Sequence, residues 1–128
     1  MNLIDASAIF NLFQNAKFPV LVAGATIPLA RYEIGSILWK NYKIKSRISQ
    51  EEAKESGAVL FELLDSMEMI SPSPKFILSL SIEKGLTFYD SAYITSAIET
   101  GYELITDDVK LYNIANSKVA VRKSSDLK

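Results

Sequence analysis

The sequence predicts a single α/β domain built on a mostly parallel sheet of four to five short strands, with helices on both faces. Short apolar runs alternate along the chain with longer segments of helical spacing, a pattern typical of strands joined by crossover helices. The 128 residues fit one hydrophobic core, and a content of 48% hydrophobic and 23% charged residues is that of a globular protein. We therefore expect residues 1–128 to form one domain.

The first elements follow from apolar spacing and from one proline. Residues 2–4 predict a strand that ends at Asp5, and residues 7–13 have the spacing of a helix. A second helix is expected over residues 28–42, because the missing N–H of a proline at its start costs no hydrogen bond. The uncharged stretch 18–30 is shorter than the ~20 residues of a membrane span, so no membrane association is expected.

The middle of the chain is marked by a capping box and a glycine. Ser49 and Glu52 have the spacing that opens a helix, which we expect to reach about residue 66. Residues 67–70 are a strand candidate. The helix that follows the Ser-Pro-Ser-Pro turn can end at Gly85 in the left-handed conformation.

The last third repeats the alternation of helix and strand. A helix is expected to start near Asp90 and to stop at Gly101. Residues 104–105 then predict a buried strand, residues 107–116 a helix and residues 119–121 a final strand. This order favours a sheet covered on both faces.

Composition excludes several kinds of active site. The chain has no histidine and no cysteine, which removes Ser-His-Asp and Cys-His catalysis, disulfides, and the nitrogen and sulfur ligands that zinc sites use. No glycine-rich phosphate loop appears. Lys and Arg number 14 against 15 Asp and Glu, so nucleic acid would have to be attracted by local clusters of charge. The N-terminus shows no secretion signal, and we expect a cytoplasmic protein.

Five acids interrupt apolar runs instead of lying on polar helix faces: Asp5, Glu33, Asp90, Asp107 and Asp108. Asp5, Asp90 and Asp107 can each be explained as a helix N-cap, whereas Glu33 falls inside a helix. Acids that follow parallel strands point into one crevice at the carboxyl edge of the sheet. Carboxylates gathered there repel one another unless a cation neutralises them, and oxygen ligands favour Mg²⁺ or Mn²⁺.

Four segments resemble the PIN-domain nucleases, in particular the VapC-like toxins of toxin–antitoxin pairs. They cover nearly the whole chain in the order typical of that family: Met1-Asn2-Leu3-Ile4-Asp5-Ala6-Ser7, Arg31-Tyr32-Glu33-Ile34, Leu86-Thr87-Phe88-Tyr89-Asp90-Ser91-Ala92-Tyr93 and Leu104-Ile105-Thr106-Asp107-Asp108. The resemblance implies a PIN-like three-layer sandwich. It also implies an acidic metal-binding and catalytic pocket of Asp5, Glu33, Asp90 and Asp108, supported by Ser7, Thr106 and the ambiguous Asp107.

The activity implied by the resemblance is Mg²⁺- or Mn²⁺-dependent endonucleolytic hydrolysis of RNA that leaves a 5′-phosphate and a 3′-hydroxyl. The role implied is that of the toxin of a type II toxin–antitoxin system, with a small antitoxin and a second copy of the chain as partners. Two alternatives remain open, namely a PIN nuclease of RNA processing and a catalytically inactive PIN binding module. For RNA contact, the candidates are Lys40, Lys43, Lys45 and Arg47, which could equally be a solvated helix end.

Overall fold

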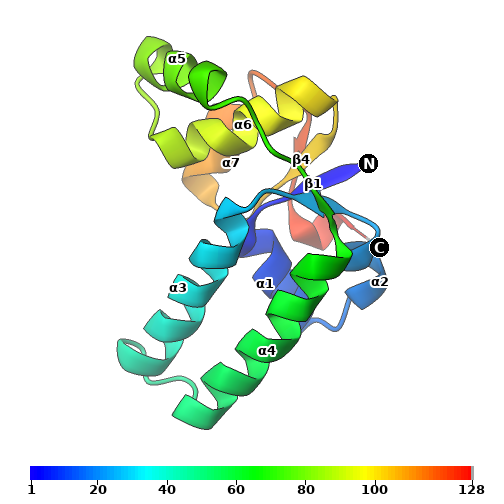
Figure 1. Cartoon of the computed structure of the whole chain (residues 1–128), viewed down its shortest axis with the longest axis vertical. Coiled ribbons are helices and arrows are strands. Elements are labelled where there is room, and N and C mark those ends of the chain that lie inside the picture. The colour runs from blue at the N-terminus through cyan, green and yellow to red at the C-terminus, as the bar shows by residue number, and fades with distance from the viewer. Residues whose placement is uncertain (128) are drawn as a thin grey trace.

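The computed structural model describes residues 1–127, which form a parallel five-stranded sheet between two layers of helices (Figure 1). The elements in chain order are β1 (Asn2–Ile4), α1 (Ala6–Gln14), α2 (Phe18–Val22), β2 (Ala25–Thr26), α3 (Leu29–Lys43), α4 (Gln50–Ser66), β3 (Glu68–Met69), α5 (Pro74–Lys84), α6 (Phe88–Thr100), β4 (Glu103–Ile105), α7 (Val109–Ala115), β5 (Val121–Arg122) and the 3-10 turn η1 (Ser124–Asp126). The predicted fold class is confirmed. Within the described residues, no helix is long and apolar enough to cross a bilayer.

The strands lie in the order β3-β2-β1-β4-β5, and every pairing is parallel. From β1 the chain builds the sheet outward through β2 and β3, and it then crosses to the other side of β1 to add β4 and β5. The order therefore reverses between β1 and β4. In open α/β sheets this reversal leaves a crevice at the carboxyl ends of the two strands, because the flanking connections leave in opposite directions.

Alternate residues of the central strands enter two separate cores, as the period of two of a β-strand requires. Ile4 and Ile105 pack into one core with residues of α1 to α4. Leu3 and Leu104 pack into the other with residues of α5, α6 and α7. Helices α3 and α4 run side by side and project beyond the sheet, whereas α5 and α6 lie at the opposite end of the molecule (Figure 1). The three layers expected for a PIN-like sandwich are present.

Several element boundaries depart from the sequence prediction. Helix α2 and strand β2 lie in a stretch for which the sequence predicted no element, because five-residue and two-residue elements are too short to show a period. Helix α6 begins at Phe88 with Thr87 as its N-cap, so the interpretation of Asp90 as a cap is wrong. The last strand is Val121–Arg122 instead of residues 119–121.

The packing of α4 gives a prediction about stability. Leu60 is fully buried, whereas the adjacent Val59 is 45% exposed. We expect Leu60→Ala to lower the free energy of unfolding by about 2–5 kcal/mol, because it removes buried methyl groups and leaves a cavity. Val59→Ala, the matched control, should change it by less than about 1 kcal/mol. Urea denaturation measures both, and equal losses would contradict this assignment of the core face.

Candidate active site

Asp5 stands at the carboxyl end of β1 and is the N-cap of α1, which confirms the interpretation of this residue as a cap. One carboxylate oxygen accepts hydrogen bonds from the Ala8 N–H at 2.9 Å and the Ser7 hydroxyl at 2.7 Å. The other accepts from the Thr106 hydroxyl at 2.5 Å. The residue is only 4% exposed. Burial raises the pKa of Asp5 to about 7 although these three hydrogen bonds act in the opposite direction, and the nearby charge of Glu33 adds to the rise.

Glu33 lies in the second turn of α3, where its carboxylate is half-buried beside Tyr93 of α6. The Tyr93 hydroxyl donates a hydrogen bond to Glu33 Oε1 at 2.6 Å. Burial raises the pKa of Glu33. The tyrosine hydrogen bond opposes this rise, and the negative charges of Asp90 and Asp108 strengthen it. Burial of the Tyr93 hydroxyl, together with the negative charge of Glu33, raises the pKa of Tyr93 well above its usual value of 10. The hydroxyl therefore stays neutral and can donate its proton in a hydrogen bond.

Tyr93 also belongs to the site, although the sequence predicted no role for it beyond its place in one of the segments that resemble the family. Its position in the sequence, three residues after Asp90, could have indicated this role. Residues three apart on a helix share a face, so the tyrosine that follows the acid by three positions points toward the same side.

Asp90 and Asp108 belong to the first turns of two neighbouring helices. The Thr87 hydroxyl caps α6 by accepting from the Asp90 N–H at 3.1 Å, so the Asp90 carboxylate is not needed as the cap. Lys110 Nζ lies 3.9 Å from that carboxylate. Asp108 is the N-cap of α7 and accepts from the Leu111 N–H at 2.9 Å. Each helix thus presents an acid at its positively polarised N-terminus.

The acids implied by the resemblance lie together around one cavity of about 350 Å³. Its walls are formed by Asp5, Ala6, Ser7, Glu33, Ser36, Ile37, Lys40, Asp90, Tyr93, Asp108 and Leu111. The acids come from four different segments, and the cavity opens at the carboxyl ends of β1 and β4. This is the crevice that the reversal of strand order creates.

Asp107 has a different environment from its neighbour. One of its carboxylate oxygens accepts from Asn11 Nδ2 at 2.7 Å and from the Ser124 hydroxyl, and the other accepts from the Ser124 N–H at 2.8 Å. Its own N–H donates to the Ser7 hydroxyl at 3.0 Å. Asp107 lines a second hollow and not the cavity of the four acids. Its interpretation as the cap of the last helix is wrong, since Asp108 has that role.

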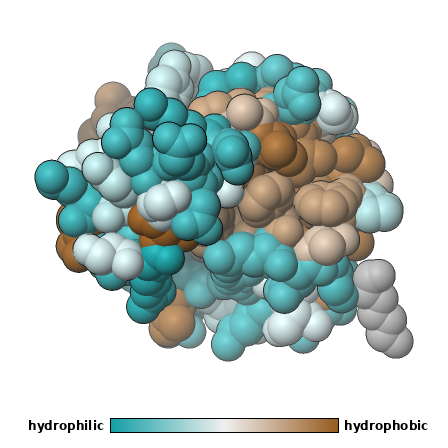
Figure 2. Space-filling view, turned by 90° about the horizontal axis from the view of Figure 1, so that it is seen from below, coloured by the Kyte–Doolittle hydropathy of each residue, from teal (hydrophilic) through white to brown (hydrophobic). Residues whose placement is uncertain are grey.

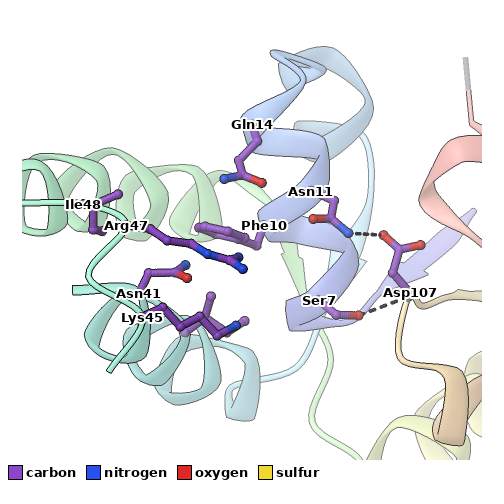
Figure 3. A pocket seen from close by; sticks show the side chains of 10 residues that line it. Ser7, Phe10, Asn11, Gln14, Asn41, Lys45, Arg47, Ile48 and Asp107 are labelled. Atoms are coloured by element: carbon purple, nitrogen blue, oxygen red, sulfur yellow. Dashed lines mark hydrogen bonds between the residues drawn. The ribbon is translucent and has the colours of Figure 1, made fainter. Parts of the chain in front are cut away.

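The basic residues divide between the two hollows. Lys40 lines the acidic cavity. Lys45 and Arg47 line the second hollow, where their side chains point toward α1 (Figure 3). Lys43 lines neither of them. Of the four candidates for RNA contact, three therefore lie beside the site.

The donor set fits a hard divalent cation, because it consists of carboxylate and hydroxyl oxygens. The pKa values of Asp5 and Glu33 are raised mainly by burial and further by the neighbouring acids, and a bound cation would oppose both effects. Across residues 1–127, however, no three acidic side chains already stand in an arrangement that would hold one ion. Asp5 and Asp108 are each engaged as helix N-caps, by the Ala8 N–H and the Leu111 N–H.

The chain is similar to two proteins of Pyrobaculum aerophilum over most of its length, although no family model matches it. It is 31% identical over 124 residues to the exonuclease VapC9 of Pyrobaculum aerophilum, which covers 93% of this chain and 87% of the relative. It is 30% identical over 118 residues to the ribonuclease VapC3 of the same organism, covering 84% and 89%.

Two solved structures share the fold. The crystal structure of PAE2754 from Pyrobaculum aerophilum superposes with a TM-score of 0.81 at 28% identity, over 98% of this chain and 92% of the other. The VapBC-1 structure from Haemophilus influenzae has a TM-score of 0.57 over 97% and 98% of the two chains, and its 12% identity shows the fold alone.

The buried acid at the end of β1 predicts how stability depends on pH. Asp5 has an ordinary pKa of 3.8 and a folded-state pKa of about 7. Between these values the folded state holds a proton that the unfolded chain releases, so the free energy of unfolding falls as pH rises. In EDTA we expect Asp5→Asn to reduce this fall, by at most about 4 kcal/mol between pH 4 and 8.

Thermal melts of both proteins across this pH range measure the effect. Glu55→Gln, which changes an exposed acid of α4, should keep the wild-type dependence on pH. If Asp5→Asn and the wild type lose stability in parallel as pH rises, the buried carboxylate is not the group that titrates.

Proposed function

Because the chain belongs to the VapC family of PIN-domain nucleases, we propose that it is a divalent-metal-dependent endoribonuclease that acts as the toxin of a toxin–antitoxin pair. One observation carries the proposal: Asp5, Glu33, Asp90 and Asp108 line one cavity at the switch point of the sheet. The relatives are named as an exonuclease and a ribonuclease, and the choice of an endonuclease follows from the resemblance to the VapC-like toxins.

In this proposal the four carboxylates hold Mg²⁺ or Mn²⁺ and position a water molecule for attack on a phosphodiester of RNA. The bound cation would lower the pKa of that water and offset the charge that develops on the phosphate. Attack on phosphorus breaks the bond to the 3′-oxygen and leaves a 5′-phosphate and a 3′-hydroxyl. Glu33, which the Tyr93 hydroxyl orients, would accept the proton of the water through the carboxylate oxygen that does not bind the cation, and the departing 3′-oxygen would take up a proton from solvent.

The presence of Lys40 is consistent with an anionic substrate in this acidic cavity. Its side chain is the cationic part of a wall otherwise rich in carboxylates. A lysine beside the acids can contact a phosphate that the carboxylates alone would repel. We also propose that the chain acts in the cytoplasm.

An apolar groove between α3 and α4 is a candidate binding site for a protein partner. It has a volume of about 520 Å³ and is lined by Gly35, Leu38, Trp39, Tyr42, Gln50, Ala53, Lys54, Gly57, Ala58 and Phe61. Trp39 is 54% exposed there. A groove of this kind suits the apolar face of an amphipathic helix. Figure 2 shows a further apolar area on the lower face of the molecule, where a second copy of the chain could pack.

The first test of the proposal is cleavage of a closed circular RNA without free ends. We expect the wild type to open the circle with Mg²⁺ or Mn²⁺ and not with EDTA. Asp90→Asn should lower the rate by more than about 100-fold, because even the outer partners of metal ligands contribute about 10–100-fold. Glu55→Gln is the control and should cleave like the wild type.

The products of this assay separate the possible activities. An intact circle together with shortened linear RNA would show an exonuclease. Cleavage by Asp90→Asn at the wild-type rate would overturn the assignment of the site. Mn²⁺ should also raise the melting temperature of the wild type more than that of Asp90→Asn, since a ligand of the folded state stabilises it.

The second test concerns the partners. We expect the purified chain to be a dimer at micromolar concentration, and we expect the small protein encoded next to it to suppress cleavage when added in equimolar amount. Trp39→Ala should weaken that suppression at least tenfold while leaving cleavage by the free enzyme unchanged. A monomer whose activity the neighbouring protein does not affect would favour an RNA-processing nuclease.

A further inference from the structure

A second hollow adjoins the acidic cavity and shares Ser7 and Ile37 with it. This hollow, here called the amide groove, has a volume of about 340 Å³. One wall is α1, and the other is the end of α3 with the segment that follows it (Figure 3). The volume lies at the lower end of the roughly 300–1,000 Å³ of small-ligand pockets. It therefore suits a single nucleotide-sized group.

Asn41 gives the first sign that the amide groove has a ligand. The residue is only 8% exposed and lines the groove from the last turn of α3. Its carboxamide makes no hydrogen bond with any other side chain or backbone group of residues 1–127. Gln14, an exposed residue, projects from α1 into the groove, and its carboxamide makes no hydrogen bond within the described residues (Figure 3). Neither carboxamide is cut off from water, because Thr95 Oγ1 is the buried side-chain polar atom without a partner in residues 1–127. Both amides are therefore available to a ligand in the groove.

The second sign is a pair of cations on the same wall. Lys45 and Arg47 point into the groove and form no ion pair within residues 1–127. Between them Ser46 has a φ of 51°, a left-handed conformation that is unfavourable for a residue other than glycine. The Arg47 N–H donates to the Asn41 carbonyl at 2.8 Å and holds this turn against the end of α3.

The groove has one acid, Asp107, on the wall opposite the cations. Its oxygens are already engaged by Asn11 and by Ser124. An anionic group is therefore attracted to the side of Lys45 and Arg47 and repelled from the other. Between these walls lie the apolar side chains of Phe10, Ile37 and Ile48.

We propose that the amide groove is the subsite for one unpaired nucleotide next to the scissile phosphate. Phe10 and the two isoleucines would contact the base, the carboxamides of Asn41 and Gln14 would bind its edge, and Lys45 and Arg47 would bind its phosphate. Carboxamides offer a donor and an acceptor side by side, as the edges of bases do. Only an unpaired base exposes its face and edge to such a groove. This inference rests on the proposed ribonuclease function and assigns its base preference to these residues.

A nucleotide explains the groove better than a peptide does. An acidic peptide also offers groups that would bind the cations and the carboxamides. The wall that the groove shares with the acidic cavity favours RNA, because it matches two adjacent positions of one strand. A peptide is therefore the occupant to consider only if RNA binding does not depend on the groove.

The test measures RNA binding in EDTA, where no cleavage occurs. Fluorescence anisotropy with labelled single-stranded oligoribonucleotides that differ in one central base gives the affinity and the order of base preference. We expect Arg47→Ala to weaken binding of every oligonucleotide about tenfold and to reduce the salt slope by about one. Asn41→Leu should level the base preference, which the wild type should show as a difference of about 5- to 100-fold.

Lys43→Ala is the matched control, because it removes a cation of the same segment that lines neither hollow. It should bind like the wild type within about twofold. Melting temperatures confirm folding, and Asn41→Leu should melt no lower than the wild type because it replaces an unpaired amide. In the cleavage assay the same variant should change the preferred cut sites.

The outcomes distinguish this inference from the function on which it rests. If the wild type binds RNA but Asn41→Leu and Arg47→Ala bind with unchanged affinity and base order, the subsite is wrong while the nuclease stands. Equal affinity for a fully paired duplex would also overturn it. If binding depends on the groove but no RNA is cut with either metal, the proposed activity fails and the subsite stands. A wild type that neither binds nor cuts RNA overturns both.

Discussion

The hydrogen bond between Thr106 and Asp5 connects the central strands of the sheet to the acids of the candidate active site. Asp5 ends β1 and caps α1, and Thr106 follows β4, the strand that pairs with β1. The two residues meet where the order of strands reverses, so their hydrogen bond closes the floor of the crevice that an α/β sheet opens there. The Asp108 N–H donates to the same threonine oxygen, which extends the connection to the start of α7.

This arrangement places a carboxylate where burial opposes its charge. Hydrogen bonds from Ser7, Thr106 and the Ala8 N–H stabilise the charged form without offsetting the burial, and Glu33 adds repulsion. The acids are thus held together at a cost to the stability of the folded chain. Such a cost is characteristic of active sites, in which groups are positioned for a ligand instead of for the scaffold alone. Tyr93 is neutral and reduces the cost by donating to Glu33.

The sequence predicted the fold class from local apolar patterns, and the four acids of the cavity from the resemblance of four segments to the PIN-domain nucleases. Acids that directly follow strands, such as Asp5, must lie at the carboxyl edge of a parallel sheet, whatever the details of the helices. The sequence could not predict β2, because two residues have no period, or the hydrogen bond of Tyr93 to Glu33, which joins two helices 60 positions apart. The amide groove depends on the turn at Ser46, and the sequence does not indicate that this serine has a left-handed backbone conformation.

The neighbours Asp107 and Asp108 show how one loop serves two purposes. A single residue of offset turns one carboxylate toward Asn11 and Ser124 and the other toward the acidic cavity. The first fixes the wall of the amide groove, and the second belongs to the proposed metal site. An acidic cavity by itself repels a polyanion, so the free energy of RNA binding has to come from neighbouring surfaces. In the proposed complex, the cations and carboxamides of the amide groove would bind the nucleotide next to the scissile phosphate. This binding would hold the scissile phosphate at the acids despite their repulsion and would orient it for hydrolysis.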